Sequence, residues 1–434
     1  MCALHRILLT LVCAAPLEGT GAPPAVPPGM VSIPGGDYKP LYSKEAKPRR
    51  TPAFFLDVTP VTNGQFLDFV RAHPEWRRSR VSRSQADENY LRHWGSDLDL
   101  GSHAGQLVHA PVTHVSWFAA RAYCSAMGRR LPSQDEWEFA ARADATRIDA
   151  STDQAFLRKL LEWYSKPATG NLPPVEQAEA NVYGLRGLHG LVWEWVHDFN
   201  STMIVGDSRG DASLERKLFC GAGSLLASDV SNYAAYMRYA FRSSLRGNYC
   251  VSSLGFRSAK SLQDEPPALA SAAGTPFELP SMWRNQDGNE VSLASLKGKV
   301  RVVTMGFTSC QYACSRIVAD MQRIESALGI DADKVGFVFI SIDPVRDTPD
   351  RLAAFAKERK LSAARWTLLS GDATAVRELA VTMNFKYQQI DEFIAHSNLI
   401  AVLDSSGSIV YRHEQIDADI APVAAAVKRK LVGP

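Results

Sequence analysis

A stretch rich in proline and alanine divides this chain of 434 residues into two unequal parts. Residues 261–280 read SLQDEPPALASAAGTPFELP and lack the apolar spacing that a helix or a strand would need. Such a composition is typical of a linker, and a chain of this length exceeds one ordinary hydrophobic core. We therefore predict a first domain over residues 28–260, a linker over 261–276 and a second domain over 277–434.

The composition is that of a soluble globular protein, with 46% hydrophobic and 22% charged residues. The 48 lysines and arginines barely exceed the 46 acidic residues, so the net charge is only +2. Nucleic-acid-binding chains usually carry a larger basic excess. We therefore expect no nucleic-acid partner.

The N-terminus has the pattern of a secretory signal. The basic pair His5 and Arg6 precedes an apolar run at 7–15, and small residues and prolines follow. We predict that residues 1–22 are a signal peptide and that the protein is periplasmic or otherwise exported. The apolar run is too short to span a bilayer. Cys13 follows a poor match to a lipobox, so a lipid anchor is one alternative and a frayed N-terminus is the other.

The second part alternates β-prone runs with helix signals. Thr348 and Pro349, for example, fit the N-cap and the first position of a helix. Alternation of this kind indicates an α/β domain with a central sheet flanked by helices. The expected strands cover 300–307, 335–342, 399–403 and 409–412, and the expected helices cover 312–328, 349–358 and 421–431.

The first part gives fewer helix signals. Thr62 with Gln65 and Ser133 with Glu136 fit capping boxes, and Ser116 can cap a third helix. Past these helices the pattern loosens, and glycine, asparagine and tryptophan become prominent. We therefore expect an α+β domain that is rich in loops.

Two of the seven cysteines lie four residues apart in the second part. Cys310 and Cys314 stand at the expected junction of a strand and a helix. The spacing would place both sulfurs on one helical face, and a helix N-terminus lowers the pKa of a thiol. Two thiolates are soft ligands for Cu(I), and His396 is the candidate third ligand. A pair of core thiols or a disulfide is the alternative.

Three motifs surround these residues in a fixed order: GFTSCQYAC at 306–314, SIDPVRDTP at 341–349 and AHS at 395–397. Together they resemble the Sco (synthesis of cytochrome oxidase) family of Cu(I) metallochaperones over essentially the whole second part. The resemblance implies a thioredoxin-like fold in which Cys310, Cys314 and His396 bind copper. It places Asp343 near the site, behind the ligands or facing the partner. It also implies delivery of copper to the Cu(A) centre of cytochrome c oxidase.

The same dithiol could instead carry out thiol–disulfide exchange, because the Sco family is also credited with reducing the cysteines of that centre. Copper binding requires both sulfurs in the reduced form, so a Cys310–Cys314 disulfide would abolish the site. The family usually has proline between the cysteines and after the second one. Here Gln-Tyr-Ala and Ser315 replace it, which bears on redox potential and partner choice.

The first part resembles the formylglycine-generating enzyme (sulfatase-modifying factor) superfamily. The resemblance implies a loop-rich α+β fold of the C-type-lectin kind. The segments that carry it are TPVTNGQF at 59–66, PVTHVSW at 111–117, GRRLPSQDEWEFAAR at 128–142, VWEW at 192–195 and GFR at 255–257.

Catalytic members of that superfamily bind Cu(I) with two cysteines just past a Gly-Gly-Ser segment. The corresponding residues 221–232 read GAGSLLASDVSN and contain no cysteine. Formylglycine-generating activity is therefore not expected, because the metal would have no thiolate pair. Cys220 and Cys250 could form a structural disulfide, or they could stay buried thiols like Cys124. An oxidase with a different metal site is a further hypothesis.

Two other features of the first part have functional and structural interpretations. Asn181 and Glu194 could bind calcium, although Leu191 replaces an asparagine that the family usually has. A polar and aromatic cluster could line a pocket or simply pack within a loop-rich fold. Its residues are Asn232, Tyr233, Tyr236, Arg238, Tyr239 and Arg242.

These patterns together predict an exported Cu(I) metallochaperone whose first domain has lost catalysis and binds the client. The client would be a copper protein such as a cytochrome oxidase subunit or a copper reductase. A thiol–disulfide oxidoreductase acting through Cys310 and Cys314 is the main alternative. Membrane contact would come only through the client or a lipid anchor.

Overall fold

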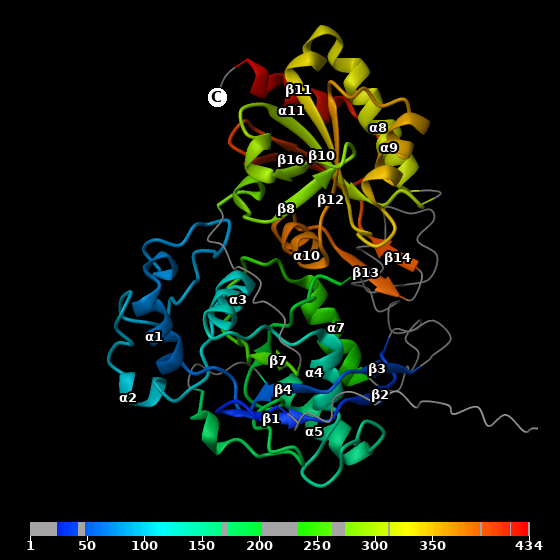
Figure 1. Ribbon diagram of the computed structural model, residues 1–434. Helices are drawn as coiled ribbons and strands as arrows, with labels where there is room; N and C mark the ends of the chain where they lie inside the picture. Colours follow the sequence, from blue (N-terminus) through cyan, green and yellow to red (C-terminus); the bar gives the residue numbers. More distant parts are fainter. Residues whose placement is uncertain are drawn as a thin grey trace, which may run out of the picture.

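The computed structural model describes residues 24–41, 48–166, 172–201, 233–262, 274–310, 313–390, 393–416 and 418–432. The predicted signal peptide and most of the predicted linker lie outside these ranges. The described residues form two bodies stacked one on the other (Figure 1). We call them the first and the second body, in chain order.

The second body is built on one seven-stranded mixed sheet with the strand order β16-β15-β10-β11-β12-β8-β9. Strands β10, β11 and β12 are parallel to one another, and the outer strands pair antiparallel. Its elements are β8 Met282–Asn285, β9 Glu290–Ser292, β10 Val300–Gly306, α8 Ala313–Leu328, β11 Val335–Ser341, α9 Pro349–Glu358, β12 Trp366–Ser370, α10 Ala373–Thr382, β13 Tyr387–Ile390, β14 Phe393–His396, β15 Ile400–Leu403, β16 Ile409–His413 and α11 Ala421–Leu431.

Helices cover both faces of this sheet, and successive residues of its central strands face opposite sides. Val302 and its register partner Phe337 pack with α8, α9 and α11. Val303 and Val338 pack on the other face, with α10. Burial on both faces explains why β10 and β11 are almost continuously apolar. The predicted α/β architecture is therefore confirmed.

The first body has short strands and more irregular backbone. Its main sheet has the order β1-β4-β7, and smaller pairings join β2 to β3 and β5 to β6. Its elements are β1 Met30–Ile33, β2 Gly36–Tyr38, β3 Arg49–Thr51, β4 Phe54–Asp57, α1 Asn63–Ala72, α2 Ala104–Leu107, α3 Trp117–Ala126, α4 Gln134–Ala141, α5 Gln154–Ser165, β5 Trp193–Glu194, α7 Tyr233–Ser244, β6 Leu254–Gly255 and β7 Ala259–Ser261.

The helix caps follow the local sequence signals. Thr62 and Ser133 both form complete capping boxes, and Ser116 accepts a hydrogen bond from the third residue of α3. Helix α4 begins at Gln134, directly after its cap Ser133. Thr348 caps α9 as predicted, with proline at its first position.

Several elements were not predicted. Helices α5 and α7 occupy the region where the sequence pattern loosens, and strand β1 was not predicted either. In the second body, α10 and the β13–β14 hairpin were missed. Their amphipathic patterns are short, and the faces that they bury are set by long-range packing rather than by local signals.

Buried ion pairs fix the interior of the first body. The Glu138 carboxylate of α4 bonds to Arg238 and Arg242 of α7. Glu194 of β5 forms a bidentate pair with Arg257, and both side chains are fully buried. Such pairs need complete hydrogen bonding to offset desolvation, and here they join α4 to α7 and β5 to the residue that follows β6 by two positions.

Helix α10 of the second body packs directly on the first body. Arg121 of α3 and Glu378 of α10 form an ion pair with 2.5 Å between Nη1 and Oε1, and their side chains are only 7% and 5% exposed. Val381 belongs to the same buried cluster as Phe118 of the first body. A Cβ at Gly247 would lie 2.5 Å from a Val381 methyl, so glycine is required for this approach. Figure 1 shows α10 at the junction of the two bodies.

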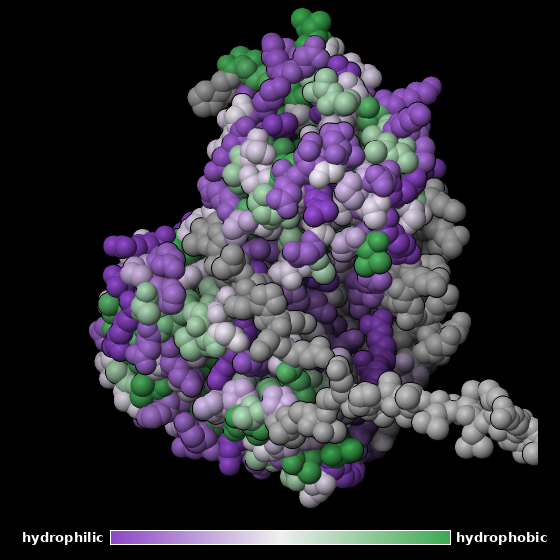
Figure 2. Space-filling view, viewed as in Figure 1, coloured by the Kyte–Doolittle hydropathy of each residue, from purple (hydrophilic) through white to green (hydrophobic). Residues whose placement is uncertain are grey.

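Within the described ranges, no helix combines the length and apolarity that crossing a bilayer requires. Figure 2 shows one face of the molecule, on which hydrophobic residues are scattered among hydrophilic ones over both bodies. Single exposed apolar residues of this kind are normal for a protein surface.

We predict that the protein loses stability as the pH is lowered from 6.5 to about 3. Burial lowers the pKa values of His93, His189 and His197 to about 3, from 6.5 in the unfolded chain. Below pH 6.5 the unfolded chain binds protons that the folded chain excludes. The free energy of unfolding therefore decreases as the pH is lowered. At pH 5 each histidine should cost about 2 kcal/mol. Urea unfolding at pH 7.5 and pH 5.0 measures this loss.

The variant His189→Gln should make the loss at pH 5 smaller by about 2 kcal/mol, the contribution of one histidine. Asn248→Ala changes a side chain that does not titrate, so this control should leave the pH dependence unchanged. An identical pH dependence in His189→Gln and the parent protein would contradict the prediction.

We also predict that Glu378→Leu lowers the free energy of unfolding by about 3–5 kcal/mol, because it leaves Arg121 buried and unpaired. The double variant Arg121→Met/Glu378→Leu should recover much of this loss. Removal of the exposed pair between Arg71 and Asp68, by Arg71→Ala, should cost about 0–1 kcal/mol. Additive losses in the double variant would show that the pair does not act as a unit.

Candidate metal centre

The two cysteines lie on either side of the start of α8. Strand β10 ends at Gly306 and α8 begins at Ala313, so Cys310 lies in the connecting loop and only Cys314 is helical. The two sulfurs lie close together all the same, because the ligand atoms of Cys310, Cys314 and His396 are all within 4.8 Å of one another. The Cys314 backbone N–H donates to the Cys310 sulfur at 3.4 Å.

The Cys314 sulfur packs against the end of β10. A Cβ at Gly306 would lie 2.9 Å from this sulfur and 3.2 Å from the Phe339 ring. The Phe307 backbone N–H donates to the same sulfur at 3.4 Å. Only glycine at 306 leaves room for Cys314, whose residue is 1% exposed.

The hairpin β13–β14 places His396 next to the cysteines. His396 is the last residue of β14, and its register partner is Tyr387 of β13. Its Nδ1 lies 2.7 Å from the Ser397 carbonyl oxygen. A carbonyl can only accept, so Nδ1 is the donor here and Nε2 is the nitrogen that is left to bind a ligand.

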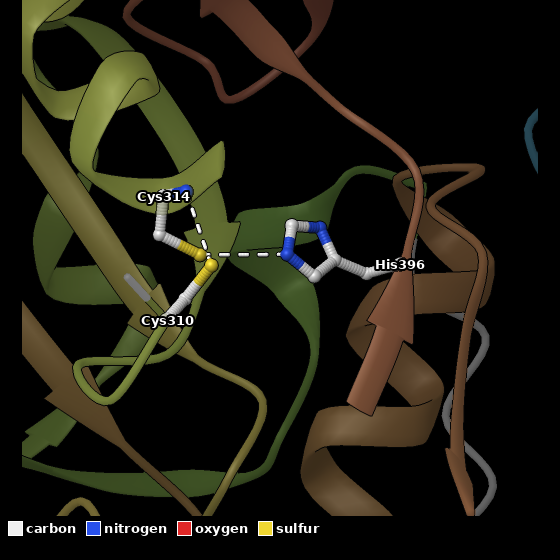
Figure 3. Close-up of side chains that lie close together, drawn as sticks. All are labelled: Cys310, Cys314 and His396. Atoms are coloured by element: carbon white, nitrogen blue, oxygen red, sulfur yellow. Dashed lines mark hydrogen bonds between the residues drawn. The ribbon is translucent and has the colours of Figure 1, made fainter. Parts of the chain in front are cut away.

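The three side chains converge on one point, as Figure 3 shows. The His396 Nε2 lies 3.4 Å from the Cys314 sulfur. One ligand atom from each of Cys310, Cys314 and His396 lies within 4.8 Å of the others. Phe307 meets the imidazole edge-on and Phe385 stacks on it, each with 5.7 Å between ring centroids.

The electrostatics of Cys314 differ from the expectation. Its pKa is raised well above the usual value by the hydrogen bond to the Cys310 sulfur, then by burial and by the charge of Cys310. At Cys314 these three causes outweigh the groups that lower the pKa, among them the hydrogen bond from the Phe307 N–H. Binding of a soft cation would supply the positive charge that lets both sulfurs be thiolates.

A carboxylate that was not singled out from the sequence holds the cysteine loop. Asp347 accepts from the Thr308 N–H at 3.0 Å, from the Thr308 hydroxyl at 2.5 Å and from the Ser341 hydroxyl at 2.6 Å. Asp343 instead pairs with Arg346, so the role of Asp343 near the ligands stays a prediction. Both carboxylates lie in the motif at 341–349, but only the fold shows which one reaches the loop.

Two thiolates and one neutral imidazole form a donor set that suits a soft, low-coordinate ion such as Cu(I). The aromatic contacts and the buried Cys314 limit water on one side of the site. Cys310 and His396 are half-buried, so the other side is accessible. The residues present therefore fit copper.

Comparisons with known families cover both bodies. Residues 20–262 match the family described as sulfatase-modifying factor enzyme 1-like domain, which is more than half of the chain. The chain belongs to this family. Residues 266–432 match the SCO1/SenC family, so the second body is a SCO1/SenC domain. Both predicted resemblances and the two predicted folds are confirmed.

Individual relatives match one body at a time. The chain is 31% identical over 235 residues to an inactive C-alpha-formylglycine-generating enzyme 2 of Mus musculus, covering 44% of this chain and 75% of that one. It is 35% identical over 107 residues to a SCO1 protein homolog of Bacillus subtilis, covering 25% of this chain and 55% of that relative. The structure of Bradyrhizobium japonicum ScoI with copper bound is 28% identical, with a TM-score of 0.32, covering 35% of this chain and 97% of that one.

The candidate residues of the sulfatase-modifying factor domain have structural partners. Arg238 and Arg242, considered for a pocket, bind Glu138 in the interior, and the buried Tyr236 and Tyr239 pack beside them. Tyr233 is 51% exposed. Asn232 and the segment 221–232 lie outside the described residues. The packing interpretation of this cluster therefore holds for its buried members.

The calcium candidates are also engaged. The Asn181 side-chain oxygen accepts from two backbone N–H groups, and the Glu194 carboxylate binds Arg257 and Trp137. Cys124 and Cys250 are buried free thiols, as in the second of the two alternatives considered, and Cys220 lies outside the described ranges.

We predict that Asp347→Ala destabilises the cysteine loop and weakens Cu(I) binding at least tenfold. The variant removes the acceptor of three hydrogen bonds, each contributing about 1 kcal/mol to stability. Urea unfolding and competition with a Cu(I) chelator measure the two effects. Asp343→Ala is the matched control and should change Cu(I) affinity less than threefold. A larger effect at Asp343 than at Asp347 would reverse this assignment.

Proposed function

We propose that the protein binds one Cu(I) ion through Cys310, Cys314 and His396 and delivers it to a client copper protein. The observation that carries this proposal is the convergence of two sulfurs and one imidazole nitrogen within 4.8 Å. The SCO1/SenC match over residues 266–432 supports the same function.

The unequal exposure of the three ligands suggests how copper is transferred. Cys310 and His396 are half-buried, whereas Cys314 lies against Gly306 in the interior. A client thiolate can therefore replace the accessible ligands first and the Cys314 sulfur last. Each step exchanges one ligand for another, so copper stays Cu(I) and the protons lost on binding are regained on release.

The client is a respiratory copper protein, and the Cu(A) centre of cytochrome c oxidase is the candidate that the Sco resemblance supports. Export to the periplasm or a similar compartment fits this client. The signal pattern at residues 1–22 supports that location.

The first body recognises the client rather than catalysing a reaction. Its catalytic cysteine pair is missing from the segment at 221–232, whereas its ion pairs and aromatic core are intact. A relative from Mus musculus carries the word inactive in its name. Loss of catalysis with retention of the fold is what a binding role requires.

Thiol–disulfide exchange is a second function, favoured by the difference between the two thiols. The half-buried Cys310 can attack a client disulfide, and the buried Cys314 can then resolve the mixed disulfide. Two electrons and two protons pass to the client, which becomes a dithiol, and Cys310 and Cys314 become a disulfide. Copper binding needs His396, whereas this exchange does not.

We predict that the reduced full-length protein binds one Cu(I) and that Cys310→Ser or Cys314→Ser abolishes tight binding. His396→Ala should weaken Cu(I) affinity about 100-fold, because the site loses one of three ligands, while the reduction potential of the dithiol changes little. Chelator competition measures the affinity, and redox-buffer equilibration measures the potential.

Two variants control for general damage. Cys250→Ala removes a buried thiol of the first body and His103→Ala removes an exposed imidazole, and neither should change copper binding. If His396→Ala changed the reduction potential of the dithiol as strongly as the Cu(I) affinity, the prediction that His396 serves copper binding but not disulfide exchange would be contradicted. Copper retained in Cys310→Ser/Cys314→Ser would place a metal site in the first body.

A further inference from the structure

The side chain of Asn200 reaches from the first body to the hairpin that carries His396. Asn200 is 5% exposed, and both ends of its amide bond to the second body. Its Nδ2 donates to the Phe385 carbonyl at 3.0 Å, and its Oδ1 accepts from Arg377 Nη1 at 2.8 Å. This amide is thus fully engaged across the junction of the two bodies.

The first of these contacts is made with Phe385, the residue that stacks on the imidazole. The Phe385 ring stacks on His396 at an interplanar angle of 23°. The next residue, Lys386, exchanges hydrogen bonds with Ser397: its N–H donates to the Ser397 hydroxyl at 3.0 Å, and its carbonyl accepts from the Ser397 N–H at 2.8 Å. The Ser397 carbonyl in turn orients the imidazole. The Phe385 backbone therefore sets the position of His396 through its ring and through Ser397.

The second contact supports the opposite strand of the hairpin. The Arg377 guanidinium lies 4.0 Å from the Tyr387 ring centroid and also donates to the Tyr387 carbonyl at 3.4 Å. Tyr387 is the register partner of His396. Through Arg377, Asn200 therefore also holds Tyr387, the first residue of β13. It thus supports both this residue and the one that stacks on the imidazole.

We propose that Asn200 is a positioning residue for the metal ligand His396, so that the sulfatase-modifying factor domain completes the copper site of the SCO1/SenC domain. The inference rests on the proposed copper-binding function. Because Phe385 is fully buried, loss of the Asn200 donor leaves its carbonyl unpaired. The hairpin must then shift to satisfy it, and a small displacement of a ligand weakens a metal site.

The chemistry of the amide provides a near-isosteric test. Aspartate at this position keeps the shape and the contact to Arg377 but has no N–H to donate to the Phe385 carbonyl. We expect Asn200→Asp and Asn200→Ala to weaken Cu(I) binding about tenfold in the full-length protein. The reduction potential of Cys310 and Cys314 should stay within error of the parent. Asn248→Ala, which removes a donor to the Arg83 carbonyl within the first body, is the matched control and should have no effect.

A double-mutant cycle decides whether Asn200 acts through His396. In the His396→Ala background, Asn200→Asp should cause no further loss of Cu(I) affinity. A further tenfold loss in that background, or unchanged affinity in Asn200→Asp alone, would overturn the proposal.

A copper-free measurement separates this inference from the proposed function. The NMR signal of the His396 imidazole depends on the Phe385 ring above it, so it should shift in Asn200→Asp and stay unchanged in Asn248→Ala. If the parent protein bound no Cu(I), the proposed function would fail, and the imidazole signal would still decide the positioning role. An unshifted signal in Asn200→Asp would overturn that role whatever the copper result.

Discussion

The contact between Gly306 and the Cys314 sulfur is the constraint on which the site depends. It joins the end of the central strand β10 to the first turn of α8, at a distance that no side chain at 306 would allow. With Cys314 fixed in the interior, Cys310 must lie in the loop before it. The open side of the pair then faces the hairpin that carries His396. The strand–helix junction thus determines which ligand is buried and which two are accessible.

Buried ion pairs fix parts of the first body that its short strands do not order. Glu138 pairs with two arginines of α7, and Glu194 pairs with Arg257, beside a large cluster of buried apolar side chains. Ion pairs of this kind demand one arrangement, because a displaced partner leaves a buried charge. Together with the apolar cluster, they explain how a domain rich in loops keeps a defined surface.

Features encoded by neighbouring residues were predicted well, and features that depend on distant contacts were not. The capping residues Thr62, Ser133 and Thr348 bond to groups three residues away, so the sequence alone identifies them. The three ligands were found because they lie in family motifs. Asn200 carries no such signal, since its partner Phe385 is 185 residues away. The helix α10 that precedes Phe385 was itself missed, because it is short and packs on the sheet of the second body and on the first body through residues distant in sequence.

The junction of the two bodies gives the first body a physical route to the copper site. A client that binds the first body can change copper affinity only if it binds differently to the two states of the site. Under the proposed positioning role, the amide of Asn200 is the contact through which the first body would act on the site, because it is bonded to the residue that stacks on His396. Linkage then requires the converse, that bound copper changes the affinity for the client by the same factor. A copper-delivery protein needs this reciprocity, since it must bind its client when loaded and leave it when empty. Fusion of the two domains in one chain, with α10 buried between them, supplies the contact through which that dependence can act.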